Sequence, residues 1–312
     1  MDSLITVDST KPEKRKLKMR FKFLICAIIY FLVIFACTRL YNYINTKFFN
    51  NDNNTDSTVS ETSDNTPKTY YINNIKSSYQ NKKMALINSK IPPQLSEEQY
   101  NNILNIYHNT SEKTVYLTFD DGPSENITPL ILDLLNQEKI KATFFVLGTN
   151  VDRYPALVQR EYSEGHFIAN HGYSHKYSEI YESAETVLND YKQCEQSVKR
   201  ALNDENFTSK VYRYPGGSNG GKYHDIKNAG KELLKENHVA YLDWNALTRD
   251  AEGTPTHESI LESLHETVGE KNVVVLLMHD SSSKILTYEA LPEVITFFRD
   301  NGYNFKTLYD VL

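Results

Sequence analysis

Cysteine is scarce in this chain, with three among 312 residues. Cys26 and Cys37 lie in an apolar segment near the N-terminus, which leaves Cys194 as the one cysteine of the remaining chain. A single thiol cannot form an internal disulfide, so a fold held together by disulfides is excluded. The main part of the chain must instead depend on a hydrophobic core, which about 200 residues can supply.

Basic charge is also scarce outside the N-terminus. The whole chain carries a net charge of -6, but residues 1–22 hold seven Lys and Arg against three Asp and Glu. The rest of the chain therefore has 27 basic and 37 acidic residues, a net charge of -10. Proteins that bind nucleic acid need clustered Lys and Arg to contact phosphates. The acidic main part argues against a nucleic-acid partner, and no motif indicates a protein partner.

One long apolar run is present, at residues 23–38, which read FLICAIIYFLVIFACT without a charged side chain. With its flank it predicts a transmembrane signal-anchor at 23–41, close to the ~20 residues that cross a bilayer. The basic residues before it place a tail of residues 1–22 in the cytoplasm and the rest outside the membrane. A cleaved signal peptide is the alternative, although no clean small-residue cleavage site follows. The sequence before Cys37 matches a lipoprotein cleavage site poorly.

Three regions follow the apolar run. Residues 42–68 are rich in Asn, Asp, Ser and Thr, which predicts a disordered linker. Residues 69–110 show no clear period and contain Pro92-Pro93, so we interpret them as a lead-in segment with a partial helix around 95–107. Residues 111–312 differ from these regions in their hydrophobic pattern, and they are predicted to form the main domain.

Short apolar strands alternate with helix-like stretches in this main domain. The expected strands are 115–119, 142–148, 166–171, 210–215, 239–244 and 273–279, and the expected helices are 126–138, 154–164, 182–203, 224–236, 256–269 and 288–301. Repeated strand-helix units predict parallel strands with helices outside them. The pattern favours an α/β fold, a distorted (β/α) barrel with fewer than eight complete units. An open, doubly wound sheet is the alternative.

Polar residues follow the first and third strands, at the end where α/β barrels build active sites. Asp120 and Asp121 end the first, and buried carboxylates are costly unless they are paired or bind a cation. Asp-Asp-Gly-Pro is also good turn chemistry, so a simple turn remains an alternative. His171 ends the third strand and His175 follows four residues later, a spacing at which two imidazoles can bind one metal ion, although such a pair alone is more often coincidental. One Asp and two His would leave coordination positions open, as a catalytic metal site requires.

Three more strands end in side chains that could act on a substrate. Arg213 could hold a carboxylate in a bidentate pair. Asp243 and Trp244 follow the fifth strand, and His279 ends the last. Each of these residues also has a purely structural interpretation. Arg213 could be a surface residue before a turn, and Asp243 and Trp244 could be a helix cap and a core aromatic. His279 could be a buried, hydrogen-bonded core residue. Five such strand ends in order favour one shared active site.

Five short motifs at these strand ends resemble the ordered motifs of the polysaccharide deacetylase family, the NodB-homology domain or family 4 carbohydrate esterases. They are TFDDGP at 118–123, HGYSH at 171–175, RYPGG at 213–217, DWN at 243–245 and LMH at 277–279. The likeness covers residues 111–312, and the spacing of the first two motifs is highly specific. The resemblance implies a barrel of the NodB type and a metal-dependent deacetylase.

The resemblance also implies a role for each site residue. Asp121, His171 and His175 would bind the metal ion, Zn²⁺ in the first place, with Co²⁺ or another divalent ion as alternatives. Asp120 would be the catalytic base and His279 the general acid, oriented by Arg213 and Asp243 respectively. The backbone N–H of Gly216 would stabilise the oxyanion, and Trp244 and Leu277 would line the pocket for the acetyl group.

Two positions depart from the family pattern. Many members have a bulky aromatic where this chain has Gly216, so the substrate groove is expected to be wider there. Gly172 stands where Ser or Thr is common, which removes a hydroxyl but no metal ligand.

The expected function is therefore removal of acetyl groups from N-acetylglucosamine of a cell-wall polysaccharide, peptidoglycan in the first place. The alternatives are chitin oligosaccharides, O-acetylated xylan, or a non-catalytic wall-binding module on the same fold. The expected partners are the cell-wall polysaccharide and the membrane that holds the N-terminal helix.

Overall fold

A computed structural model describes residues 94–108 and 112–312. The predicted cytoplasmic tail, signal-anchor and linker, and the first part of the lead-in, lie outside these residues. Within residues 94–108 and 112–312, none of the helices combines the length and the hydrophobicity that a membrane span needs.

One sheet of parallel strands forms the centre of the described structure. Its order is β5-β4-β3-β2-β1-β7-β6, and β8 pairs with the first half of β1. The strands are β1 Thr114–Asp120, β2 Thr143–Val146, β3 Phe167–Asn170, β4 Val211–Tyr212, β5 Ala240–Tyr241, β6 Ala246–Leu247, β7 Val273–His279 and β8 Asn304–Lys306. The end strands β5 and β6 do not pair with each other among the described strands. The sheet is therefore a curled, incomplete barrel, which confirms the predicted fold class for the main domain.

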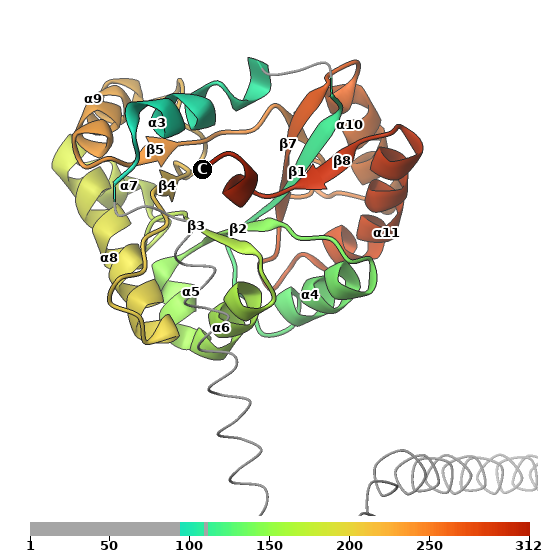
Figure 1. The fold of residues 1–312 in the computed structure, drawn as a ribbon, viewed down its shortest axis with the longest axis horizontal. Helices are drawn as coiled ribbons and strands as arrows, with labels where there is room; N and C mark the ends of the chain where they lie inside the picture. The colour runs from blue at the N-terminus through green and yellow to red at the C-terminus, as the bar shows by residue number, and fades with distance from the viewer. Residues whose placement is uncertain (1–93, 109–111) are drawn as a thin grey trace, which may run out of the picture. The chain divides into compact units, whose positions relative to one another are not determined.

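Helices lie around the outside of the strands in Figure 1. They are α4 Thr128–Gln137, α5 Gly148–Arg153, α6 Pro155–Ser163, α7 Tyr177–Ile180, α8 Ala184–Leu202, α9 His224–Glu236, α10 His257–Val268 and α11 Ile285–Asp300. The six strands and six helices expected from the sequence are all present. The structure adds α5, α7, β6 and β8, which are too short to show a period.

The two sides of the sheet bury different sets of residues because side chains alternate along a strand. In β1, Val115, Leu117 and Phe119 face the outer helices and belong to one hydrophobic cluster. Tyr116 belongs to a second cluster on the inner side of the curled sheet. Asp120 is an even-numbered residue of the same strand, so it points to the inner side. The strand pattern thus decides which polar residues reach the interior of the barrel.

The lead-in segment closes the gap in the barrel. Helix α3 (Glu97–Leu104) contacts β5, and the 3₁₀ turn η1 (Ile106–His108) contacts β7. Ser96 caps α3 in a reciprocal capping box with Gln99. Apolar side chains of the segment, among them Ile103 and Ile106, join the inner hydrophobic cluster. The partial helix expected around 95–107 is confirmed, and it packs as part of the barrel.

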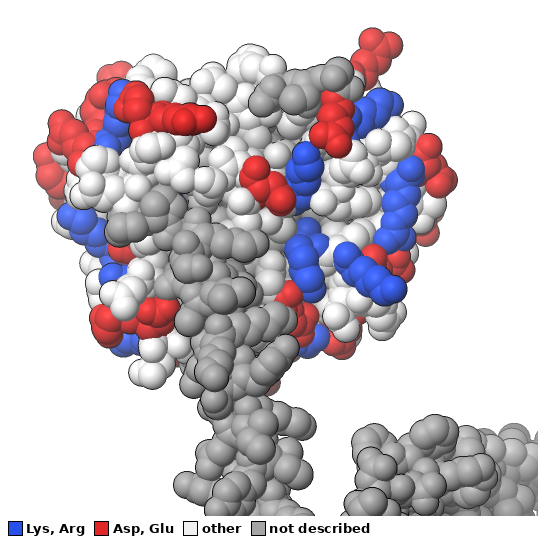
Figure 2. Space-filling model, in the orientation of Figure 1, with Lys and Arg blue, Asp and Glu red and all other residues white. Residues whose placement is uncertain are grey.

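Charged side chains of both signs share the face that Figure 2 shows. Acidic groups dominate its upper left, whereas Lys and Arg alternate with Asp and Glu over its right half. The ion pairs of the described residues include Arg299 with Glu138 at 2.5 Å and Lys306 with Glu112 at 3.4 Å. Exposed pairs of this kind contribute ~0–1 kcal/mol each.

Candidate active site

Side chains from the carboxyl ends of β1 and β3 converge on one point. His171 Nε2 lies 3.5 Å from Asp121 Oδ1, and His175 Nε2 lies 3.4 Å from the same oxygen. One ligand atom from each of the three residues lies within 4.8 Å of the other two. Ligand atoms at ~2.1 Å from a tetrahedral ion are about 3.4 Å apart, so this spacing fits a divalent cation. The three residues predicted as metal ligands therefore form one candidate metal site.

The chemistry of this cluster also suits a cation. Asp121 Oδ1 is buried and has no hydrogen-bond partner among the described residues, which is costly for an oxygen without a cation. His171 Nδ1 lies 2.8 Å from the carbonyl oxygen of Arg213 and donates to it, which leaves the lone pair on Nε2. Burial lowers the pKa of His171 to about 3, so its imidazole is neutral. Neutral imidazoles and a free carboxylate oxygen are the ligands that zinc accepts.

Asp190 of α8 positions the loop between the two histidines, and the sequence did not single it out. Its carboxylate accepts hydrogen bonds from the backbone N–H groups of Tyr173 (2.9 Å) and Ser174 (3.2 Å). A Cβ on Gly172 would lie 2.1 Å from Asp190 Oδ2, and Gly172 has a φ of +84°. Gly172, one of the two departures from the family pattern, is therefore required by the close approach of Asp190.

Asp120 and Arg213 form a buried ion pair on the inner side of the barrel. Arg213 Nη1 lies 2.7 Å from Asp120 Oδ1, and the two residues are 0% and 2% exposed. Arg213 also donates to Thr118 Oγ1 and to the carbonyl of Leu242, and it stacks on Phe145 at 3.8 Å. Burial raises the pKa of Asp120, and the Arg213 guanidinium opposes that rise. Asp120 Oδ2, which Arg213 leaves free, lies 3.6 Å from His171 Nε2 and faces the ligand cluster.

His279 stands directly opposite Asp120, since the two residues are register partners in β1 and β7. Its Nδ1 lies 2.9 Å from Asp250 Oδ1, and its backbone N–H donates to Asp250 Oδ2. Burial by itself favours the neutral ring, but the hydrogen bond and charge of Asp250 raise the pKa of His279 to about 9. Thr287 Oγ1 donates to Asp250 as well, at 2.7 Å. His279 is therefore held in its protonated form.

The prediction that Asp243 orients His279 is wrong, because Asp250 holds that place. The Asp243 carboxylate instead accepts from the backbone N–H of Ser218 at 2.9 Å and from its hydroxyl at 2.7 Å. Asp243 thus fixes the loop that carries Gly216. Asp250 follows the short strand β6, which no pattern in the sequence revealed, and this is why the sequence did not indicate it.

The three residues predicted to line the substrate pocket lie near these groups. The Gly216 N–H donates to no backbone acceptor among the described residues. A Cβ added to its neighbour Gly217 would lie 3.3 Å from the Trp244 ring, so this loop packs against Trp244. Trp244 packs at the edge of the inner hydrophobic cluster. Leu277 precedes His279 by two residues on β7, so it faces the same side of the sheet.

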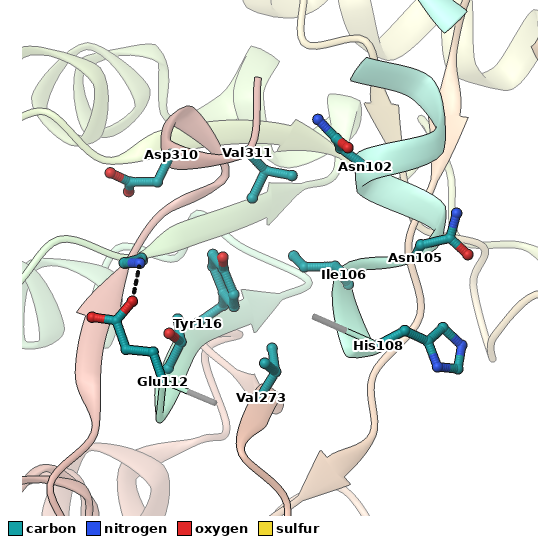
Figure 3. A pocket seen from close by; sticks show the side chains of 11 residues that line it. Asn102, Asn105, Ile106, His108, Glu112, Tyr116, Val273, Asp310 and Val311 are labelled. Atoms are coloured by element: carbon teal, nitrogen blue, oxygen red, sulfur yellow. Dashed lines mark hydrogen bonds and ion pairs between the residues drawn. The ribbon is translucent and has the colours of Figure 1, made fainter. Parts of the chain in front are cut away.

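A cavity of about 320 Å³ lies at the other end of the strands. Figure 3 shows its wall, which includes Tyr116 and Val273 from the first half of β1 and the start of β7, together with Ile106, His108 and Asp310. Active sites in barrels of this kind form at the carboxyl ends of the strands. The cavity is therefore separate from the convergent polar groups described above.

The chain matches the family model "Polysaccharide deacetylase" over residues 107–233. Two Bacillus cereus proteins, both named peptidoglycan-N-acetylglucosamine deacetylase, are similar: one is 34% identical over 65% of this chain and 89% of its own length. The other is 30% identical over 65% of this chain and 72% of its own. The solved structure of a Streptococcus mutans CE4 esterase is 34% identical, with a TM-score of 0.59, over 69% of this chain and 91% of that one.

The chain therefore belongs to the polysaccharide deacetylase family, and the enzyme is a deacetylase. The family is metal-dependent in general, and the Asp121, His171 and His175 cluster is the candidate metal site of this chain.

Proposed function

We propose that this enzyme removes the acetyl group from N-acetylglucosamine residues of peptidoglycan, with Zn²⁺ as its metal ion. The observation that carries the proposal is that two titratable side chains, Asp120 and His279, lie beside the candidate metal site and each has its own charged partner. Asp120 is held by Arg213, and His279 is held by Asp250, on register partners of β1 and β7. The names of the two Bacillus cereus relatives support the choice of sugar and polymer.

Asp121, His171 and His175 would hold a divalent cation, which would supply Lewis acidity that lowers the pKa of water and polarises a carbonyl oxygen. Asp120 Oδ2, free of Arg213, accepts a proton from the attacking water. The water oxygen bonds to the acetyl carbon, and the Gly216 N–H donates to the oxyanion that forms.

His279 completes the reaction as general acid. As the carbon–nitrogen bond breaks, the ring donates the proton on Nε2 to the leaving amine, which gives acetate and a free glucosamine amine. A pKa of about 9 keeps this proton on the ring at neutral pH. Trp244 and Leu277 pack around the acetyl methyl, and Asp243 acts on the reaction only by fixing the loop of Gly216.

The location of the enzyme is a second part of the proposal. Residues 23–41 anchor the chain in the cell membrane, with residues 1–22 in the cytoplasm and the catalytic domain outside. The basic tail and the apolar run of the sequence support this orientation. A linker of ~30 disordered residues averages about 30 Å from end to end, which would bring the enzyme to the inner wall. Fractionation and external protease digestion of intact cells would test it, and recovery in the cytosol would reject it.

Acetate release from purified peptidoglycan by the full-length chain tests the proposed activity. The assay is run with zinc, with a chelator, and with the Asp120→Asn variant. Zinc-dependent release that is lost in the variant supports both the substrate and the base. Release from chitin oligosaccharides or O-acetylated xylan, with none from peptidoglycan, rejects the substrate. A folded, zinc-loaded protein that binds wall material and releases acetate from none of these polymers would be a binding module instead.

A further inference from the structure

The loop that carries Gly216 is covered by an aromatic side chain from another element. A Cβ on Gly216 would lie 2.6 Å from the hydroxyl oxygen of Tyr177 and 3.1 Å from its Cζ. The phenol end of Tyr177 therefore occupies the space that a side chain at position 216 would take. The wider groove expected from the missing aromatic at Gly216 is not what the structure shows, because α7 brings a ring to the same place.

The same ring also lies beside the candidate metal site. The Tyr177 and His175 ring centroids are 5.5 Å apart, with an angle of 51° between the planes. Burial and the negative charge of Asp121 raise the pKa of Tyr177, which agrees with its place near the ligand cluster. Tyr177 thus lies between a candidate metal ligand and the N–H proposed to stabilise the oxyanion.

Tyr177 is supported on one side and open on the other. Its ring packs edge-to-face on Tyr181 at 5.8 Å, and the Tyr181 hydroxyl donates to the Pro215 carbonyl at 2.7 Å. Tyr181 therefore fixes both the ring of Tyr177 and the loop beneath it. Yet Tyr177 is 41% exposed, which is unusual for a large apolar side chain in the described part of the chain.

We propose that Tyr177 is a substrate-binding residue that sets specificity for the sugar. Its exposed ring packs against the apolar face of the pyranose whose acetyl group is removed, and its hydroxyl donates to an oxygen of that sugar. A rigid ring with a polar tip suits a ligand that presents C–H groups on one face and hydroxyls at its edge. This inference rests on the proposed function, since it names a contact of the same site.

Binding of an N-acetylglucosamine tetramer by calorimetry tests the inference. The full-length Asp120→Asn chain is used so that the tetramer is not consumed, and it is compared with the same chain carrying Tyr177→Ala, Tyr177→Phe or Tyr154→Ala. Tyr154 is the matched control, because its ring contacts Arg153 at 5.2 Å and it lies between α5 and α6. We expect the Kd to rise about tenfold for Tyr177→Ala, a loss typical of one aromatic contact, about twofold for Tyr177→Phe, and not at all for the control.

Kinetics in the wild-type background separate binding from a structural role. For Tyr177→Ala we expect KM for the tetramer to rise about tenfold with kcat nearly unchanged, and hydrolysis of a small acetyl ester to be unaffected. A fall in kcat on both substrates with an unchanged Kd would overturn the inference. So would an unchanged Kd and KM.

The two proposals fail in different ways. If the Asp120→Asn chain binds the tetramer through Tyr177 but wild type releases acetate neither from the tetramer nor from peptidoglycan, the deacetylase proposal fails and the Tyr177 inference stands. If wild type deacetylates the tetramer and Tyr177→Ala binds it equally well, only the Tyr177 inference fails. If the Asp120→Asn chain does not bind the tetramer at all, the Tyr177 inference is rejected, and acetate release from peptidoglycan alone decides the deacetylase proposal.

Discussion

The carboxylate of Asp250 accepts a hydrogen bond from Nδ1 of His279 at 2.9 Å, across the ends of β6 and β7. This contact decides the protonation state of the proposed general acid. Because the folded-state pKa of His279 is raised to about 9, the pair contributes stability that is fully present below pH ~6.5 and is lost as the pH rises through about 9. The pair is therefore intact throughout the neutral range in which the enzyme would act.

Replacing Asp250 with Asn should move the alkaline limb of the pH-rate profile. Without the carboxylate, burial favours the neutral ring, so the limb set by His279 should shift from near pH 9 to below pH ~7. At pH 8, kcat should fall by about tenfold or more, because a ring with a pKa of ~7 or below is at most about one-tenth protonated there. The profile of acetate release between pH 5 and 10 measures both effects.

Asp243→Asn is the control for this experiment. Its carboxylate contacts Ser218 and not His279, so the alkaline limb should stay in place even if the rate falls. A shift of the limb in Asp243→Asn and not in Asp250→Asn would contradict the assignment of the partner.

Removing the guanidinium of Arg213 should destabilise the protein strongly. Arg213→Met leaves the Asp120 carboxylate buried and unpaired, which costs about 3–5 kcal/mol. For a domain of this size the Tm should fall by roughly 10 °C. Arg200→Met removes an exposed ion pair with Asp152 at 2.9 Å and should cost under ~1 kcal/mol. Thermal unfolding of the two variants makes the comparison, and equal losses would show that Arg213 and Asp120 are not a critical pair.

Zinc should raise the Tm only when the three ligands are intact. At a zinc concentration ~100 times Kd, binding stabilises the folded state by about 2.7 kcal/mol, or roughly 5–10 °C for a domain of this size. Asp121→Asn, His171→Ala and His175→Ala should each lose most of this rise. Asp120→Asn should keep it, because its proposed role is that of a base. Bound zinc, measured by atomic absorption, should follow the same order, and full zinc occupancy in Asp121→Asn would place the metal elsewhere.

The close packing of Gly216 and Tyr177 should appear as coupling between two substitutions. Gly216→Ala introduces a Cβ against the phenol and places Ala at a φ of +72°, so it should destabilise the protein. Tyr177→Ala removes the clash but not the backbone strain, so the double variant should recover part of the loss. Residues in contact show coupling energies of about 0.5–3 kcal/mol. Denaturant unfolding of the four proteins measures it, and strictly additive losses would indicate that the two residues do not touch.

Much of the fold follows from local patterns in the sequence. The long strands β1 and β7 and the helices α8 and α9 carry strong apolar periods, and their observed bounds lie within one or two residues of those predicted. The two-residue strands could not be predicted in this way. Strand β6 consists only of Ala246 and Leu247, which pair with β7, so it is too short to show a hydrophobic period and exists only because β7 lies beside it. The sequence therefore does not indicate Asp250, which follows β6, and the family resemblance assigns the orientation of His279 to Asp243 instead.

The sequence by itself determined the family, the order of strands and helices, and the candidate metal ligands, because these depend on residue types at fixed spacings along the chain. The tertiary structure decided which carboxylate holds His279, why Gly172 must lack a side chain beside Asp190, and which ring covers Gly216. Each of these depends on the approach of loops that are far apart in the sequence. Such distances are set by how strands pair and helices pack, and no local pattern of residues records them.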